Sequence, residues 1–159
     1  MGTTLIIIAL VVVIAFIAFA SLPQKHRTAT AAYSRKPLLT PNELEFFHRL
    51  RNALPPHLIV CPQVAMSAII QPNRQKEANP QEYMRLRGSI AQKIIDFVVI
   101  DSTTGTTIAI LELDDKTHVK TKDQQRDALT ASANIPTIRW NSRSKPTADQ
   151  IRHAILSLQ

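Results

Sequence analysis

Two acidic residues stand within strongly apolar stretches of the sequence, where an unpaired negative charge is costly to bury. Asp96 is the one polar residue between Ile94 and Ile100, and Glu112 interrupts the apolar run from Ile108 to Leu113. Turn-forming residues separate the two runs, which predicts a β-hairpin. A hairpin loop centred near Thr104 places Asp96 directly opposite Glu112, with Cβ atoms about 4.5–5.5 Å apart. Two like charges at that separation need a neutralising partner.

Alternation along the second strand adds Asp114 to the face of Glu112, so three carboxylates are expected to converge near the strand ends. Oxygen-only ligands suit Mg²⁺ or Mn²⁺, and a divalent ion is the simplest neutraliser of this group. A raised carboxyl pKa is the competing explanation. Asp114 and Asp115 also fit a solvated turn that merely ends the strand, and a one-residue shift of the loop would separate Asp96 from Glu112.

Helices and further strands must hold this hairpin in place. Thr40 to Glu43 has the form of a capping box, with proline at the first helical position, and Asn134 is a candidate left-handed helix cap. Between the first strand and the hairpin lies a polar, basic excursion over 71–92 with a short helix at 81–86. The remaining predicted helices are 41–53, 122–133 and 147–158, and the strands are 58–66, 94–100, 107–113 and 136–140. The order helix, three strands, helix, strand, helix predicts an α/β fold.

The N-terminal part of the chain differs sharply in composition from the rest. The first 24 residues carry no ionisable side chain, and every residue from Leu5 to Ala20 is apolar. This predicts a transmembrane anchor over 1–23, with a cleaved signal peptide as the alternative. Basic residues follow it, so residues 24–37 form a juxtamembrane linker on the cytoplasmic side of the inner membrane, and the folded domain over 38–159 is expected to be cytoplasmic.

The charge balance indicates a polyanionic partner. The chain carries 19 Lys and Arg against 12 Asp and Glu, a formal net charge of +7. Nucleic acid or an anionic membrane surface is the expected neighbour. The single cysteine, Cys61, excludes an intrachain disulfide and a cysteine-rich zinc site.

Three sequence patterns carry a resemblance to a known superfamily. They are I-I-D-F-V-V-I at 94–100, I-L-E-L-D-D-K-T-H at 110–118 and Q-Q-R-D at 124–127. With their flanking elements they resemble the PD-(D/E)XK nuclease superfamily, in the branch similar to very-short-patch repair (Vsr) endonucleases, and look like an uncharacterised bacterial domain family of that branch. The resemblance implies a restriction-endonuclease-like core in which Asp96 and Glu112 hold Mg²⁺ or Mn²⁺.

The resemblance also implies roles for residues around that pair. Glu43 contributes to the metal site or only caps its helix, and His118 acts as a general base, binds the scissile phosphate or lies on the surface. The family commonly has Lys two residues after the Glu, where this chain has Asp114; Lys93 or Lys116 could supply the missing cation, and the departure puts turnover in question. The residues expected to contact nucleic acid are Lys93, Lys120, Lys122 and Arg126, and Arg126 is suited either to a phosphate or to a carboxylate of the site.

These observations predict a membrane-tethered, Mg²⁺-dependent nuclease acting on DNA or RNA, with Asp96, Glu112, Asp114, His118, Glu43 and Lys116 as its catalytic residues. The missing lysine favours an alternative, a catalytically silent nuclease-like domain that binds nucleic acid or a partner protein. A weaker third hypothesis is a scaffold whose positive charge binds membrane lipids.

Overall fold

The computed structural model describes residues 10–14, 17, 33–114 and 120–158, without the side chains of 120–123. The chain divides into two compact units, 1–36 and 37–159. In the first unit, residues 10–14 are helical and exposed. Within the described residues, no helix combines the length and apolar character that a membrane crossing requires. The rest of the anchor predicted over 1–23 lies outside the described residues.

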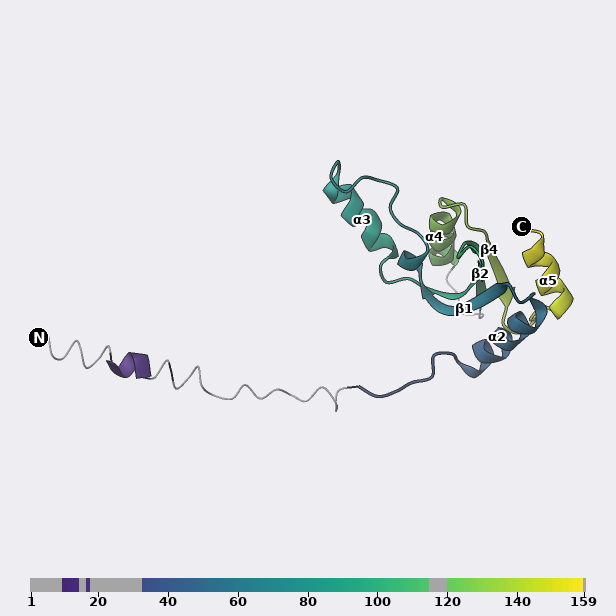
Figure 1. The fold of residues 1–159 in the computed structure, drawn as a ribbon, viewed down its shortest axis with the longest axis horizontal. Helices are drawn as coiled ribbons and strands as arrows, with labels where there is room; N and C mark the ends of the chain where they lie inside the picture. The colour runs from purple at the N-terminus through teal and green to yellow at the C-terminus, as the bar shows by residue number, and fades with distance from the viewer. Residues whose placement is uncertain (1–9, 15–16, 18–32, 115–119, 159) are drawn as a thin grey trace, which may run out of the picture. The chain divides into compact units, whose positions relative to one another are not determined.

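Four strands form one mixed sheet in the second unit (Figure 1). They are β1 (Leu58–Ala65), β2 (Ile94–Asp101), β3 (Thr107–Asp114) and β4 (Thr137–Asn141), and their spatial order follows the sequence. The first three pair antiparallel, whereas β4 pairs parallel to β3. The helix between β3 and β4 is therefore the crossover that parallel pairing needs.

Helices cover both faces of this sheet, as predicted for an α/β fold. They are α2 (Pro41–Ala53), α3 (Pro80–Ile90), α4 (Lys120–Ala131) and α5 (Ala148–Leu156), with the 3-10 helix η2 (Met66–Ala68) after β1. The capping box of Thr40 and Glu43 is formed, and Asn134 has φ 57°. The predicted element order is thus confirmed.

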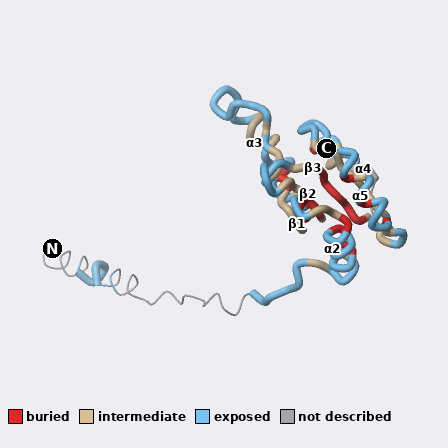
Figure 2. The backbone as a smooth tube through the Cα atoms, turned by 45° about the vertical axis from the view of Figure 1, so that its right-hand side comes forward, coloured by how far each residue is buried: buried red, intermediate tan, exposed pale blue. Residues whose placement is uncertain are grey.

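The apolar core lies on both sides of the sheet (Figure 2). On one face α2 and α5 pack over β2 and β3, and the ring of Phe46 meets Phe97 and Trp140 edge-on, with centroids 5.7 Å apart in both pairs. On the other face, η2 and the end of α3 pack against β2 and β3, and Leu129 of α4 joins them. A strand covered on both faces reads as a continuous apolar run, which explains the sequence of β2.

The β2–β3 hairpin has the predicted register. Phe97 pairs with Leu111 and Val99 with Ala109. The register shifts between Val99 and Ile100, close to the turn, where a bulge absorbs one residue. Because the shift lies on the turn side, it leaves the pairing near Asp96 unchanged.

β1 lies at the edge of the sheet, a position in which a proline such as Pro62 is tolerated. Gln63, the next residue, has φ 54°, in the left-handed region that non-glycine residues seldom adopt. The flanking residues Pro62 and Val64 pair with Phe97 and Ile95, so Gln63 occupies the position beside Asp96. The strand is therefore distorted where it passes the acidic pair.

The segment between β1 and β2 contains the helix whose bounds differ most from the prediction. The helix expected at 81–86 runs from Pro80 to Ile90, with Asn79 as its N-cap. It extends from one end of the sheet, away from α2 and α5 (Figure 1). Ile90 alone among its residues is buried, so α3 is joined to the core mainly at its C-terminal end.

Candidate functional site

Asp96 and Glu112 lie side by side on the face of the sheet that α4 covers. The register of β2 and β3, continued by one pair, sets them opposite each other. The main-chain N–H of Leu113 donates a hydrogen bond of 3.0 Å to Oδ2 of Asp96. Glu112 is 3 % exposed, which makes it the one acidic residue buried in the described part of the chain.

Arg126 of α4 supplies one counter-charge to this pair. Its Nη2 donates to Oε1 of Glu112 and to the carbonyl oxygen of Ile94, both at 2.7 Å. Its Nε is buried and has no hydrogen-bond partner among the described residues. The guanidinium therefore fastens α4 to the strands and leaves one buried N–H unsatisfied.

The pKa of Glu112 is raised from its ordinary value of 4.5 to about 8. Burial is the main cause, because it penalises the charged form, and the neighbouring Asp96 adds to it. The positive charges of Arg126 and Arg139 act in the opposite direction and are outweighed. The acidic pair therefore lacks positive charge despite two nearby guanidinium groups.

Arg139 of β4 forms a second ionic centre beside the pair. It is the parallel neighbour of Glu112 in the sheet, and its Nη1 lies 2.8 Å from Oδ1 of Asp114. Nε and Nη2 bond the two carboxylate oxygens of Asp127 at 3.2 and 2.8 Å. Burial disfavours its charge, yet the bond to Asp127 and the charge of Asp114 hold the pKa of Arg139 above its usual range.

The carboxylates present fit a divalent ion bound by two protein ligands. Mg²⁺ is commonly held by one or two carboxylates, with water and substrate phosphate completing its shell. The contacts from Leu113 and Arg126 each take one oxygen of Asp96 and Glu112. The neighbouring Asp96 is one of the causes that raise the pKa of Glu112, and a cation at the pair would relieve this repulsion.

A larger acidic site is not assembled in the described part of the chain. No group of three or more His, Cys, Asp or Glu side chains there is placed to hold a metal ion. The third predicted carboxylate, Asp114, is paired with Arg139 instead.

Glu43 reaches the neighbourhood of the acidic pair through an intermediary. Its Oε2 accepts the N–H of Thr40 at 2.6 Å in the capping box, and its Oε1 accepts Nε2 of Gln63 at 3.2 Å. Gln63 in turn occupies the β1 position beside Asp96. The capping role is thus formed, and the same carboxylate is linked to the strand that borders Asp96.

Several predicted site residues have less structural description. Lys116 and His118 lie outside the described residues, and Lys120 and Lys122 fall in the first turn of α4, whose side chains are not described. Lys93 is half-buried between α3 and β2, and its carbonyl oxygen accepts the N–H of Met66 at 2.8 Å.

Sequence reasoning missed Arg139 and Gln63. Arg139 had a usable signal, because it is the one charged residue in the short strand Thr137–Asn141. Gln63 gave none apart from its neighbour Pro62, since a left-handed residue in a strand cannot be read from residue type when it is not glycine.

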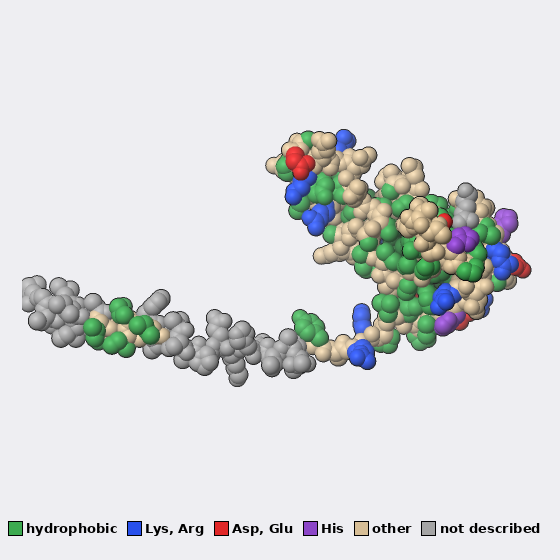
Figure 3. Space-filling model, in the orientation of Figure 1, with side chains coloured by type: hydrophobic (Ala, Val, Ile, Leu, Met, Phe, Trp, Pro, Cys, Tyr) green, Lys and Arg blue, Asp and Glu red, His purple; other side chains and the backbone are tan. Residues whose placement is uncertain are grey.

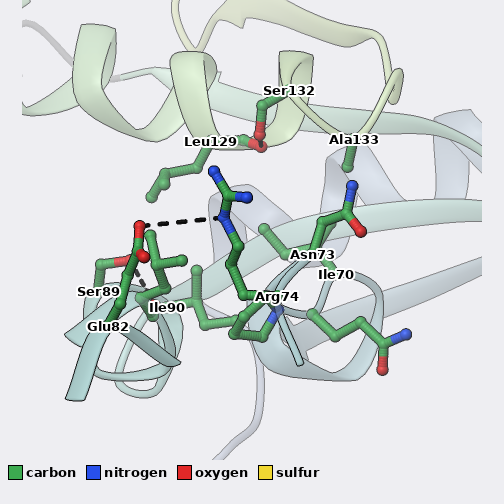
Figure 4. Close-up of a pocket in the computed structure, with 12 residues that line it drawn as sticks. Ile70, Asn73, Arg74, Glu82, Ser89, Ile90, Leu129, Ser132 and Ala133 are labelled. Carbon is green, nitrogen blue, oxygen red and sulfur yellow. Dashed lines mark hydrogen bonds and ion pairs between the residues drawn. The ribbon is translucent and has the colours of Figure 1, made fainter. Parts of the chain in front are cut away.

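A cavity of about 610 Å³ lies apart from the acidic pair. It opens between α3, the loop before it and the C-terminal part of α4, and Arg74 reaches across it toward Glu82 (Figure 4). None of the predicted catalytic residues that the structure describes lines this cavity. The acidic pair, and not the cavity, is therefore the candidate site.

The comparisons with known proteins give a family. Residues 35–158 match the family described as "Protein of unknown function (DUF2726)", so the chain belongs to this family. No curated protein and no solved structure matches the chain.

Proposed function

We propose that this protein is a metal-dependent nuclease, a PD-(D/E)XK enzyme of the Vsr-like branch, which hydrolyses phosphodiester bonds in DNA or RNA. The observation that carries the proposal is the position of Asp96 opposite Glu112 in the β2–β3 hairpin, with Glu112 buried and its pKa raised. Mg²⁺ or Mn²⁺ bound there would convert a costly pair of acids into a ligand set.

Residues of this chain would share the work around the ion. A bound Mg²⁺ lowers the pKa of a coordinated water and neutralises charge on the phosphate. Asp96 and Glu112 would hold the ion, and Arg126 would keep Glu112 in place through Nη2. His118 would accept the proton of the attacking water, and Arg139 would keep Asp114 and Asp127 in place.

Cleavage by the purified full-length chain tests this proposal. Plasmid, linear duplex and single-stranded substrates should be cut with Mg²⁺ or Mn²⁺ and left intact with EDTA. Glu112→Gln keeps the size of the side chain and should abolish cutting, whereas Glu77→Gln removes an equal charge from an exposed position and should not. Activity that survives in Glu112→Gln would reject the assignment.

The ion pairs favour a second candidate, a nuclease-like domain that binds nucleic acid or a partner protein without cutting it. Arg126 already bonds Glu112, and Arg139 bonds Asp114 at the position of the family's lysine. In this version Lys116, Lys120, Lys122, Arg126 and the basic stretch 74–87 contact phosphates. Binding that needs no metal, weakens steeply with salt and leaves the substrate whole would select it.

We also propose that the N-terminal apolar segment anchors the protein in the inner membrane with the domain in the cytoplasm. The support is the sequence alone, an uncharged segment followed by Lys25, His26 and Arg27. Alkaline extraction of membranes should leave the protein in the pellet, and protease added outside spheroplasts should spare the domain. A scaffold that only binds lipids would show vesicle binding that depends on lipid charge, without nucleic-acid binding.

A further inference from the structure

One face of α3 is exposed and directed away from the domain. Glu82, Leu86 and Ser89 line the cavity between α3 and α4, which fixes the side of the helix that faces the domain (Figure 4). The opposite side carries Met84 and Gly88, with Arg85 on one flank and Arg87 on the other. All four residues are exposed, Met84 to 55 %, and together they form the outer face of α3.

Two cations flank this face. The side chains of Arg85 and Arg87 make no hydrogen bond or ion pair with any described residue, and Figure 3 shows basic side chains gathered over α3. At 3.6 residues per turn, residues two apart point about 160° from each other around the helix axis. Met84 and Gly88 lie between them, on the side away from the cavity. The outer face of α3 is therefore a narrow surface with a positive charge on either side.

Gly88 is not required by the packing of the domain. A Cβ atom built there would meet no atom within 4 Å, and the residue has no positive φ. Glycine inside a helix costs stability relative to alanine, so nothing within the fold explains its presence. Its lack of a side chain lets the surface of another molecule approach the helix closely.

We infer that the outer face of α3 binds in the major groove of duplex DNA, with Arg85 and Arg87 on the phosphates of the two groove walls and Met84 and Gly88 toward the base edges. The inference rests on the proposed function for its choice of a nucleic-acid partner. An α-helix is about 10–12 Å across with its side chains, and the B-form major groove is about 12 Å wide. Arginine suits phosphate because its planar guanidinium offers paired donors.

The placement of the two arginines favours duplex DNA over other polyanions as the partner of this face. A flat bilayer meets one side of a helix, whereas cations about 160° apart suit a groove with two anionic walls. The major groove of A-form RNA is deep and too narrow for side chains to read, so duplex RNA does not fit the same surface.

Equilibrium binding of the full-length chain to a short DNA duplex, in EDTA and over a range of NaCl concentrations, tests the inference. The double variant Arg85→Gln, Arg87→Gln should bind about tenfold more weakly. Its slope of log affinity against log salt should fall by about 1.8, at about 0.9 per phosphate contact. The matched control, Arg51→Gln with Arg143→Gln, removes two exposed charges elsewhere and should keep the larger part of the slope. An equal loss in both variants would overturn the inference.

Gly88→Ala provides a readout that a purely structural role would not give. The substitution should raise the melting temperature, because alanine favours the helix, and yet weaken DNA binding severalfold, with Gly88→Gln weaker still. Ser89→Ala, on the cavity side of the same helix, should raise the melting temperature and leave binding unchanged. Unchanged binding in Gly88→Ala would overturn the close approach to DNA.

Two further arms identify how a failure arises. If the arginine variants lose binding to anionic vesicles but keep DNA binding, the outer face of α3 contacts membrane and the inference is wrong. If the wild-type chain binds DNA through this face but never cuts it with Mg²⁺, the catalytic proposal fails and the surface stands. If the wild type cuts DNA and the α3 variants bind it normally, the catalytic proposal stands and the inference about the outer face of α3 is wrong.

Discussion

Nη2 of Arg126 lies 2.7 Å from Oε1 of Glu112, so a fixed cation already stands on one side of the acidic pair. The same nitrogen donates to the carbonyl oxygen of Ile94, which ties α4 to β2. Any metal ion at the pair must therefore share Glu112 with an arginine that also has a structural role.

Replacing Arg126 with Gln should have opposite effects on folding and on metal binding. The metal-free protein should lose about 1–3 kcal/mol of unfolding free energy, because the hydrogen bonds that tie α4 to Glu112 and Ile94 are lost. Mg²⁺ binding measured by calorimetry at pH 8.5 should become severalfold tighter, because a competing positive charge is gone. Looser Mg²⁺ binding in this variant would show that Arg126 supports the ion and does not compete with it.

The raised pKa of Glu112 predicts a pH dependence of stability. Between pH 4.5 and about 8 the folded chain holds a proton on Glu112 that the unfolded chain has released. The unfolding free energy should therefore be highest below that range and fall as pH rises through it, by at most about 1.4 kcal/mol per pH unit. Denaturant titrations without metal measure this slope.

The control for that pH dependence is a pair of matched variants. Glu112→Gln removes the titrating group and should flatten the slope, whereas Glu77→Gln should keep it, because Glu77 is exposed. Saturating Mg²⁺ should reverse the trend, since the ion binds the deprotonated pair. A wild-type slope that matches Glu112→Gln would mean that Glu112 does not hold this proton.

Glu43→Gln separates the two roles of Glu43. Glutamine also completes a capping box, so the unfolding free energy should change by less than about 0.5 kcal/mol. Removing the charge beside Gln63 should nevertheless lower the cleavage rate if the carboxylate orients a ligand of the site. Glu43→Ala loses both functions and serves as the comparison. Wild-type cleavage in Glu43→Gln would leave Glu43 with its capping role alone.

Arg139→Met should destabilise the domain by about 1–3 kcal/mol, because it leaves Asp114 and Asp127 facing each other without their shared cation. This range allows for the partial exposure of the two side chains, which is 27 % for Asp114 and 42 % for Asp127. Arg139→Lys keeps the charge but cannot bond both oxygens of Asp127, so its unfolding free energy should lie between those of the wild type and Arg139→Met. Chemical denaturation measures all three, and equal stability of the Met variant would show that solvent screens the network.

The sequence was informative where local chemistry decides structure. A turn centred near Thr104 predicted the correct pairing of β2 with β3 near Asp96. The prediction holds because the bulge at Val99 and Ile100 lies between the turn and the acidic pair, close to the turn. The resemblance offered a site carboxylate as one of two possible partners of Arg126, and Arg126 does bond Glu112. Arg139 was not anticipated, because it lies on a strand that tertiary packing places beside Glu112.

The distortion of β1 also has a consequence for how these molecules meet one another. Pro62 has no N–H to give, and the left-handed Gln63 bends the strand beside it. A second copy that paired with β1 could not form a continuous ladder of hydrogen bonds along it. The distortion that lies beside Asp96 therefore also disfavours edge-to-edge aggregation of the domain.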